Sequence, residues 1–290
     1  MSVMDTADVE RAERALGWRP TSARPAAGDR GKTAAGARWI VSDARRSAFV
    51  KIGSTAATAE WLRTEHRNLV SIAAPFMPRV VGFSDDGRRP VLATEDLSLA
   101  EWPPPWSADR IQAVLDALQA VRETAPIAAL RPFQPETTRA WTSVAADPEP
   151  FLRLGLCSAP WLEQTLPALA RAEADAPLAG EALVHGDVRS DNLCFRDGAA
   201  ILIDWNHATI ANPVLDVAFW LPSLHAEGGP SPEEILPDAP ELAAWVAGYF
   251  CSRAGDPPIV EAPHVRPLQL LQSRTALPWA ARALGLRPPS

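Results

Sequence analysis

Residues 181–220 constrain the fold more than any other segment, because they place polar groups at the ends of short apolar runs. A His-Gly-Asp loop at 185–187 precedes two β-rich apolar runs, at 192–195 and 200–205. The intervening Arg-Asp-Gly at 196–198 is typical of a turn between hairpin strands. The sequence therefore predicts a strand–turn–strand unit that follows a polar loop.

The length of this turn decides which faces of the hairpin carry Asn192 and Asp204. A three-residue turn, with Gly198 left-handed, pairs Phe195 with Ala199 and puts both polar side chains on one face. They would then lie roughly 7 Å apart on a diagonal, a separation that one Mg²⁺ ion can bridge. A two-residue turn would put them on opposite faces. We expect the three-residue turn, with a core on the other face made of Leu193, Phe195, Ile201 and Ile203.

A second group of polar residues lies in the first third of the chain. Of the 28 basic residues only two are lysines, and one of them, Lys51, lies near the end of an apolar run at 47–52. Glu65 lies on the apolar face of a predicted helix over 56–73. Because burying an isolated carboxylate is costly, we expect Glu65 to have a cationic partner, and a neighbouring arginine is one alternative. A solvated strand end is the less favoured alternative for Lys51.

The pattern of apolar residues divides the chain into a β-rich first part and a mainly helical remainder. A Pro-rich stretch at 102–106 connects the two, and we expect domains at 1–96 and 97–290. Ser107 is a suitable N-cap for the first helix of the second part. The predicted strands lie within 20–53 (37–42 and 47–52), at 79–84 and at 90–94. The predicted helices cover 5–16, 56–73, 108–123, 161–174, 233–252 and 266–284.

Composition and charge exclude several classes of function. A net charge of −7 argues against a nucleic-acid-binding protein, because no basic field is available to attract phosphates. No apolar run reaches the roughly 18 residues that span a membrane, and the polar N-terminus predicts a cytoplasmic protein. Cys157, Cys194 and Cys251 are far apart, which predicts free thiols and no zinc site. The oligomeric state is not readable from the sequence.

The spacing His185-x-Asp187-x-x-x-x-Asn192, with Asp204 on the next predicted strand, resembles the catalytic loop and metal-binding aspartate of the protein-kinase-like superfamily. His-Gly-Asp followed by Asp-Trp is most similar to aminoglycoside phosphotransferases and their choline- and sugar-kinase relatives. The resemblance covers about residues 20–225. It implies a bilobal α+β fold, with a small β-rich N-terminal lobe and a larger, mainly helical C-terminal lobe.

The resemblance also implies a function, the transfer of the γ-phosphate of ATP to a hydroxyl of a small molecule. Asp187 would orient and deprotonate this hydroxyl, and His185 would brace the catalytic loop. Asn192 and Asp204 would hold Mg²⁺ on the ATP phosphates. Arg189 stands where His or Lys is common; it would contact the γ-phosphate or pair with the neighbouring Asp191.

The nucleotide-binding roles come from the first part of the chain. Lys51 resembles the lysine that holds the α- and β-phosphates, and Glu65 resembles its helix partner. The backbone of Glu95 and Leu97 would bind adenine. Asp216 resembles the aspartate that ties down the catalytic loop.

The chain departs from the family pattern in several places. Ser190-Asp191 stands where Pro-Gly is common, and Asn206 where an acidic residue is usual. Gly28, Gly31 and Gly36 do not form a kinase glycine-rich loop. Gly31-Lys32-Thr33 suggests a P-loop, but Ala26 occupies the position where that motif needs a glycine.

Other functions stay open at this point. A catalytically inactive kinase fold that serves as a binding module is one alternative, and a protein kinase is another. The second is less favoured, because Asp216 follows Asp204 too soon for a long activation segment. The acceptor would be an aminoglycoside, a sugar, an amino alcohol or another metabolite. Acidic residues in 226–290 suit a cationic aminoglycoside or a solvated helix face: Glu227, Glu233, Glu234, Asp238 and Glu241.

Overall fold

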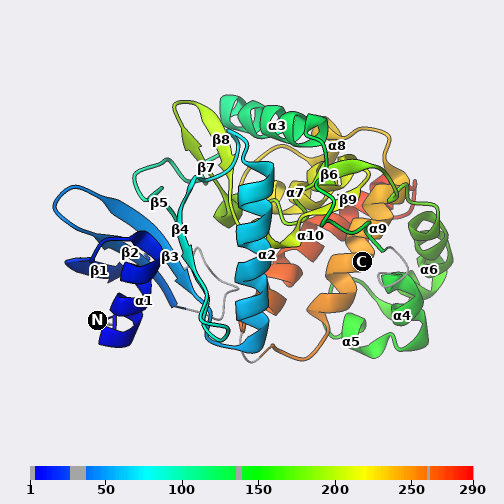
Figure 1. Cartoon of the computed structure of the whole chain (residues 1–290). Helices are drawn as coiled ribbons and strands as arrows, with labels where there is room; N and C mark the ends of the chain where they lie inside the picture. The colour runs from blue at the N-terminus through cyan, green and yellow to red at the C-terminus, as the bar shows by residue number, and fades with distance from the viewer. Residues whose placement is uncertain (1–3, 27–36, 135–138, 260–261, 290) are drawn as a thin grey trace. The chain divides into compact units, whose positions relative to one another are not determined.

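The computed structural model describes residues 4–26, 37–134, 139–259 and 262–289. The chain forms two compact units, one of residues 1–103 with 191–208, and one of residues 104–190 with 209–290 (Figure 1). The expected α+β composition, with a β-rich N-terminal region and a mainly helical C-terminal region, is confirmed. The segment 191–208, which the sequence placed with the helical region, joins the first unit.

The first unit contains an antiparallel five-stranded sheet in the order β1-β2-β3-β5-β4. Its strands are β1 (Ser22–Pro25), β2 (Ala37–Ser42), β3 (Ser47–Ile52), β4 (Val80–Ser84) and β5 (Val91–Glu95). Its helices are α1 (Thr6–Leu16) and α2 (Ala56–Ile72). Strand β1 falls within the stretch 20–53 predicted as β structure, and the other elements lie within two residues of their predicted ranges. The predicted Gly-rich stretch with Gly28, Gly31 and Gly36 lies outside the described residues.

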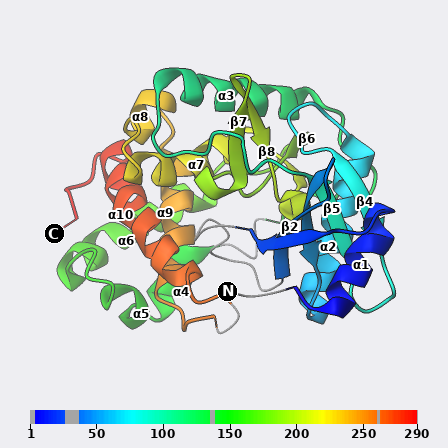
Figure 2. The same cartoon turned by 90° about the vertical axis from the view of Figure 1, so that its left-hand side faces the viewer.

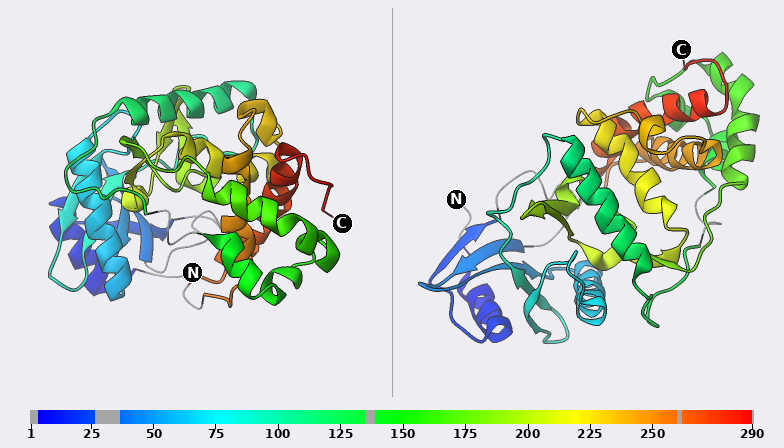
Figure 3. Two further views of the ribbon diagram at one scale, coloured as in Figure 1. Left: turned by 90° about the vertical axis from the view of Figure 1, so that its right-hand side faces the viewer. Right: turned by 90° about the horizontal axis from the view of Figure 1, so that it is seen from above.

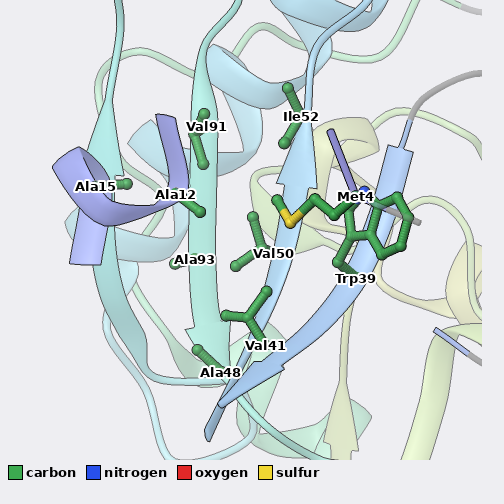
Figure 4. Packing of buried hydrophobic residues seen from close by; sticks show 10 residues of the cluster. All are labelled: Met4, Ala12, Ala15, Trp39, Val41, Ala48, Val50, Ile52, Val91 and Ala93. Atoms are coloured by element: carbon green, nitrogen blue, oxygen red, sulfur yellow. The ribbon is translucent and has the colours of Figure 1, made fainter. Parts of the chain in front are cut away.

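Alternation along the strands gives the sheet two different faces. One face is apolar and is covered by α1, whose Ala12 and Ala15 pack against it (Figure 4). The same cluster contains Met4 and the strand residues Trp39, Val41, Ala48, Val50, Ile52, Val91 and Ala93. The residues between them, Lys51 among others, point to the opposite face. Burial of one face therefore fixes which side chains the other face presents.

The hairpin of β7 (Leu193–Arg196) and β8 (Ala199–Leu202) corrects the predicted register. Arg196 pairs with Ala199, so the turn has two residues, Asp197 (φ 52°) and Gly198 (φ 79°). Both φ values are positive, as a type I′ turn requires, and an aspartate tolerates this conformation. The expected pairing of Phe195 with Ala199 is wrong.

The observed register also changes which apolar side chains share a face of the hairpin. Cys194 and Ile201 pack with Leu97, whereas the prediction placed Ile201 on the face of Leu193 and Phe195. Both faces are buried, since Leu193 and Leu202 have no exposed surface. Alternation of apolar residues therefore carried no information about the register here.

The second unit is mainly helical (Figure 3). It also contains a two-stranded sheet of β6 (Ala182–Val184) and β9 (Thr209–Ala211). Helix α9 is buried on most sides and contacts α4, α5, α6, α7 and α10; its neighbour α10 runs beside it in Figure 2. The helices are α3 (Ala108–Glu123), α4 (Ala140–Ala146), α5 (Glu149–Leu152), α6 (Ala159–Ala174), α7 (Val214–Ala226), α8 (Pro232–Ile235), α9 (Pro240–Ala254) and α10 (Val265–Ala283).

The helix predictions fail where burial or proline hides the periodicity. Helix α3 begins and ends as predicted, with the Ser107 side chain accepting from the Arg110 amide. The helix predicted over 233–252 is two helices, separated around Asp238, whose φ is 52°. Helix α7 was not predicted, because it is apolar on all sides and contains Pro222.

No helix in the described ranges is long and apolar enough to span a membrane. All three cysteines are free, as predicted, and Cys194 and Cys251 are buried. Burial raises the pKa of Cys194 and of Cys251 to about 12, and that of the half-buried Cys157 to about 11. These thiols are therefore protonated and unreactive near neutral pH.

Substitution of Gly82 in β4 will separate α1 from the sheet. A Cβ atom at this position would overlap the backbone carbonyl of Ala15 in α1, and neither backbone can move without loss of packing. We expect Gly82→Ala to lower the free energy of unfolding by about 1–3 kcal/mol, measured by urea titration. Ser84→Ala on the same strand is the matched control and should change it by less than about 0.5 kcal/mol. Equal stabilities of both variants would contradict this packing.

Candidate active site

Lys51 is the centre of a buried cluster of charges in the first unit. Its Nζ lies 2.8 Å from both carboxylate oxygens of Glu65 on α2, and 2.6 Å from Oδ1 of Asp204. Lys51 and Glu65 are 7% and 3% exposed. The strand, the helix and the segment after β8 thus converge on one ammonium group.

Arg38 on β2 is a further member of this cluster. The β2–β3 register places it directly opposite Lys51, and its Nη2 lies 3.5 Å from Oδ2 of Asp204. Arg38 was not predicted from the sequence as a site residue. The signal was available, because a turn at 43–46 pairs residue 42 with 47 and therefore 38 with 51.

Glu65 is fully enclosed by protein. Burial raises its pKa above the usual value, and the adjacent Lys51 ammonium opposes that rise. Lys51 contacts both carboxylate oxygens and so supplies the partner that this buried group needs. An apolar helix face can therefore carry this residue.

Asn192 and Asp204 lie next to the same end of the β7–β8 hairpin. The Ile203 amide donates to the Asn192 carbonyl at 2.8 Å. Asp204 is the next residue in the chain after Ile203. Neither residue belongs to a strand: Asn192 ends a 3-10 turn, and Asp204 is left-handed, with φ 68°. The same-face argument for these two side chains is therefore wrong, because strand alternation does not apply to them.

The donor atoms of Asn192 and Asp204 are chemically suited to Mg²⁺. Amide and carboxylate oxygens are its usual protein ligands, and a magnesium site uses one or two carboxylates together with substrate phosphates. Among the described residues there is no group of three or more His, Cys, Asp or Glu side chains placed to hold a metal.

A pocket of about 700 Å³ lies on the sheet face that carries Lys51. This volume is within the range of small-molecule sites. Strand alternation explains the lining, because Arg38, Ile40, Phe49 and Lys51 share one face. The lining also includes Arg24, Glu65, Thr94, Glu95, Leu97, Trp102, Asp191 and Ile203.

Glu95 and Leu97 lie at the edge of this pocket. The Glu95 carboxylate accepts from the Arg79 amide at 3.0 Å and from Arg196 at 2.9 Å. The Leu97 carbonyl accepts from the Ala100 amide and from the indole of Trp102, at 3.0 and 3.2 Å. These bonds fix the backbone of the segment that follows β5.

The loop 185–187 lies in the second unit and is ordered by Asp216, in the first turn of α7. The two Asp216 carboxylate oxygens accept from the amides of His185 and Gly186, each at 2.8 Å. The Asp187 amide lies 3.2 Å from Nδ1 of His185, which is fully buried. The side chain of Asp187 is 29% exposed and is presented by a loop with a fixed backbone.

Two contacts of the residues after Asp187 were not predicted. Arg189 Nη2 lies 3.3 Å from Oδ2 of Asp187, whereas the sequence suggested Asp191 or a phosphate as its partner. Ser190, which stands where proline is common, donates to Glu227 at 2.6 Å. Glu227 also accepts from the indole of Trp106 at 2.9 Å. The serine at position 190, where proline is common, therefore allows a hydrogen bond between the loop and the end of α7.

The predicted site residues thus form two groups. Lys51, Glu65, Asp204 and Asn192, together with Glu95 and Leu97, belong to the first unit; His185, Asp187 and Arg189 belong to the second.

The fold is that of the kinase-like phosphotransferases. A thermostable mutant of aminoglycoside phosphotransferase APH(4)-Ia, solved with ADP and hygromycin B, has a TM-score of 0.60 at 16% identity, with 97% of this chain and 98% of that chain covered. Spectinomycin phosphotransferase APH(9)-Ia, solved with ADP and spectinomycin, has a TM-score of 0.56 at 13% identity, covering 97% and 95%. A putative aminoglycoside phosphotransferase from Ralstonia eutropha has a TM-score of 0.57 at 13% identity, covering 95% and 98%.

The chain belongs to the phosphotransferase enzyme family (APH), whose sequence model matches residues 30–254. No curated protein matches the chain significantly. The solved structures are less than 25% identical to it, so their likeness establishes the fold.

Removal of the Lys51 ammonium will leave Glu65 buried without its partner. We expect Lys51→Met to lower the free energy of unfolding by about 3–5 kcal/mol. Lys51→Met combined with Glu65→Leu should recover most of this loss, because an apolar pair can replace a buried ion pair. Urea unfolding measures both, with Arg88→Met at an exposed position as the control. A double variant no more stable than the single one would contradict the pairing.

Asp216 predicts a pH dependence of stability. Burial raises its pKa from the usual 3.8 to about 6, although the two amide donors oppose the rise. The native state therefore binds the proton more tightly than the unfolded chain, so the stabilising contribution of Asp216 is largest below pH 3.8 and is lost as the pH rises to about 6. The loss amounts to roughly 3 kcal/mol.

Unfolding free energies measured between pH 4 and 7 test this contribution. The Asp216→Asn variant should lack the decrease between pH 4 and 6. The matched Glu173→Gln variant should keep this decrease and instead lack the decrease that Glu173 causes up to about pH 7, because burial raises the pKa of Glu173 to about 7. Parallel profiles for Asp216→Asn and the wild type would refute the prediction.

Proposed function

We propose that this protein transfers the γ-phosphate of ATP, as its magnesium complex, to a hydroxyl group of a small molecule. The observation that carries the proposal is the contact of the Lys51 ammonium with both Glu65 and Asp204, beside a pocket of about 700 Å³. A nucleotide-binding lysine needs such fixed carboxylates, which hold it toward the phosphates.

Each end of the nucleotide has candidate partners in this pocket. The Leu97 carbonyl already accepts two hydrogen bonds, so we assign adenine recognition to the Leu97 amide and the Glu95 carbonyl. The Lys51 ammonium would neutralise charge on the α- and β-phosphates. Magnesium, held by the oxygens of Asn192 and Asp204, would supply the remaining neutralisation of phosphate charge.

Asp187 would orient the acceptor hydroxyl and take up its proton. Its partly exposed carboxylate stands on a backbone that Asp216 and His185 hold in place. Arg189 contacts Asp187 and would hold its carboxylate in place before the acceptor binds. Alignment of hydroxyl and phosphate is the main demand of phosphoryl transfer, and a rigid loop meets it.

The acceptor belongs to the class of small hydroxylated molecules. Hygromycin B and spectinomycin are bound in the similar structures, and aminoglycosides are therefore the first candidates beside sugars, amino alcohols and other metabolites. A cytoplasmic location stays a prediction of the sequence.

Asp187→Asn tests the catalytic assignment. Loss of the general base should lower kcat by about 10²–10⁴-fold, while the Kd for Mg-ATP stays within about twofold of the wild type. ATP consumption with a panel of antibiotics, sugars and amino alcohols measures turnover, and calorimetry measures binding. Asp147→Asn, at an exposed position, is the control. Wild-type turnover of Asp187→Asn would reject this role, and an absence of ATP binding by the wild type would reject the function.

A further inference from the structure

Arg38 lies in the nucleotide-sized pocket but has no place in the residue pattern that identifies the family. It projects from β2 on the same sheet face as Lys51, directly opposite it in the strand register. Its side chain is 23% exposed, compared with 9% for Lys51. Arg38 is therefore partly open to the pocket.

The two cations share one carboxylate. Lys51 Nζ lies 2.6 Å from Oδ1 of Asp204, and Arg38 Nη2 lies 3.5 Å from Oδ2. Both oxygens of Asp204 therefore face a positive charge within the protein. A metal ion that binds Asp204 has to weaken these contacts.

The charges of this cluster balance only while Asp204 contacts the two cations. Like charges directly opposite each other on neighbouring strands repel, and Arg38 and Lys51 form such a pair. Glu65 and Asp204 supply two negative charges that offset the two positive ones. If Asp204 binds a metal ion instead, Arg38 and Lys51 lose one of the two negative charges that offset theirs. A polyphosphate that arrives with the metal restores it.

We propose that Arg38 is a phosphate-binding residue of this pocket and that, without nucleotide, it holds Asp204 against binding Mg²⁺ alone. The proposal rests on the proposed function, since it assumes that the pocket receives Mg-ATP. A guanidinium group offers a planar fork of donors that matches phosphate oxygens, which a lysine lacks. Nucleotide and metal then bind together. The metal takes Asp204 away from Arg38 and Lys51, and the phosphates replace Asp204 as the partner of these two cations.

Calorimetry of the Arg38→Gln variant distinguishes the role of Arg38 in phosphate binding from its role in limiting Mg²⁺ binding by Asp204. We expect the Kd for Mg-ATP to rise by about 10–100-fold, because the variant loses charged hydrogen bonds to phosphate. The Kd for adenosine should stay within about twofold, since adenosine carries no phosphate. The affinity for Mg²⁺ without nucleotide should rise, because Asp204 loses one competing cation. A residue that only stabilises the fold would not shift ATP and Mg²⁺ in opposite directions.

Arg45→Gln is the matched control, because Arg45 is an exposed arginine of the β2–β3 turn outside the pocket lining. It should leave all three affinities unchanged. Arg38→Lys keeps the charge without the fork and should bind Mg-ATP with intermediate affinity. It also serves as the test variant if Arg38→Gln does not fold.

The outcomes separate this inference from the proposed function. If the wild type binds Mg-ATP and the Arg38 variants bind it equally well, the role of Arg38 is overturned and the function stands. If ATP and adenosine binding weaken together, Arg38 is structural and the inference is again overturned. If the wild type binds neither ATP nor adenosine, the proposed function fails first, and the inference fails with it.

Discussion

The first unit depends on the burial of the Lys51 ammonium among carboxylates. A buried charge is tolerated only when its partners are held in place, so the elements that carry these partners must also be held. Glu65 belongs to α2, and Asp204 follows β8 more than a hundred residues later in the chain. One nitrogen atom therefore links three segments that are far apart in sequence. The placement of the Lys51 ammonium and the folding of this unit are therefore consequences of the same ion cluster.

In the second unit, a buried carboxylate likewise holds the loop 185–187 in place. Asp216 accepts hydrogen bonds from two consecutive backbone amides, those of His185 and Gly186. A loop has few packing contacts to define its shape, and a carboxylate with two amide donors replaces them. Glu227 adds a second tie through Ser190. The loop that presents Asp187 is thus defined by hydrogen bonds from two points of the helical region.

Local signals in the sequence were sufficient for most elements but not for register or tertiary contacts. The Ser107 cap and the strand at 47–52 depend on neighbouring residues and were predicted closely. The turn at Asp197 and Gly198 was misjudged, because both faces of its hairpin are buried and alternation cannot distinguish two registers. The candidate site residues came from motif spacing, and their catalytic roles stay proposals. The Ser190–Glu227 contact joins residues far apart in sequence and has no local signal.

The return of residues 191–208 to the first unit has a consequence for synthesis. Leu97 packs against Cys194 and Ile201, which the ribosome adds about a hundred residues later. At about 5–20 residues per second, the nascent chain waits roughly 5–20 s for this partner. During that interval Leu97 and its apolar neighbours Ala100 and Trp102 lack their cover. The first unit is not a continuous stretch of chain, so we expect it to complete its fold only after residues 191–208 have been synthesised.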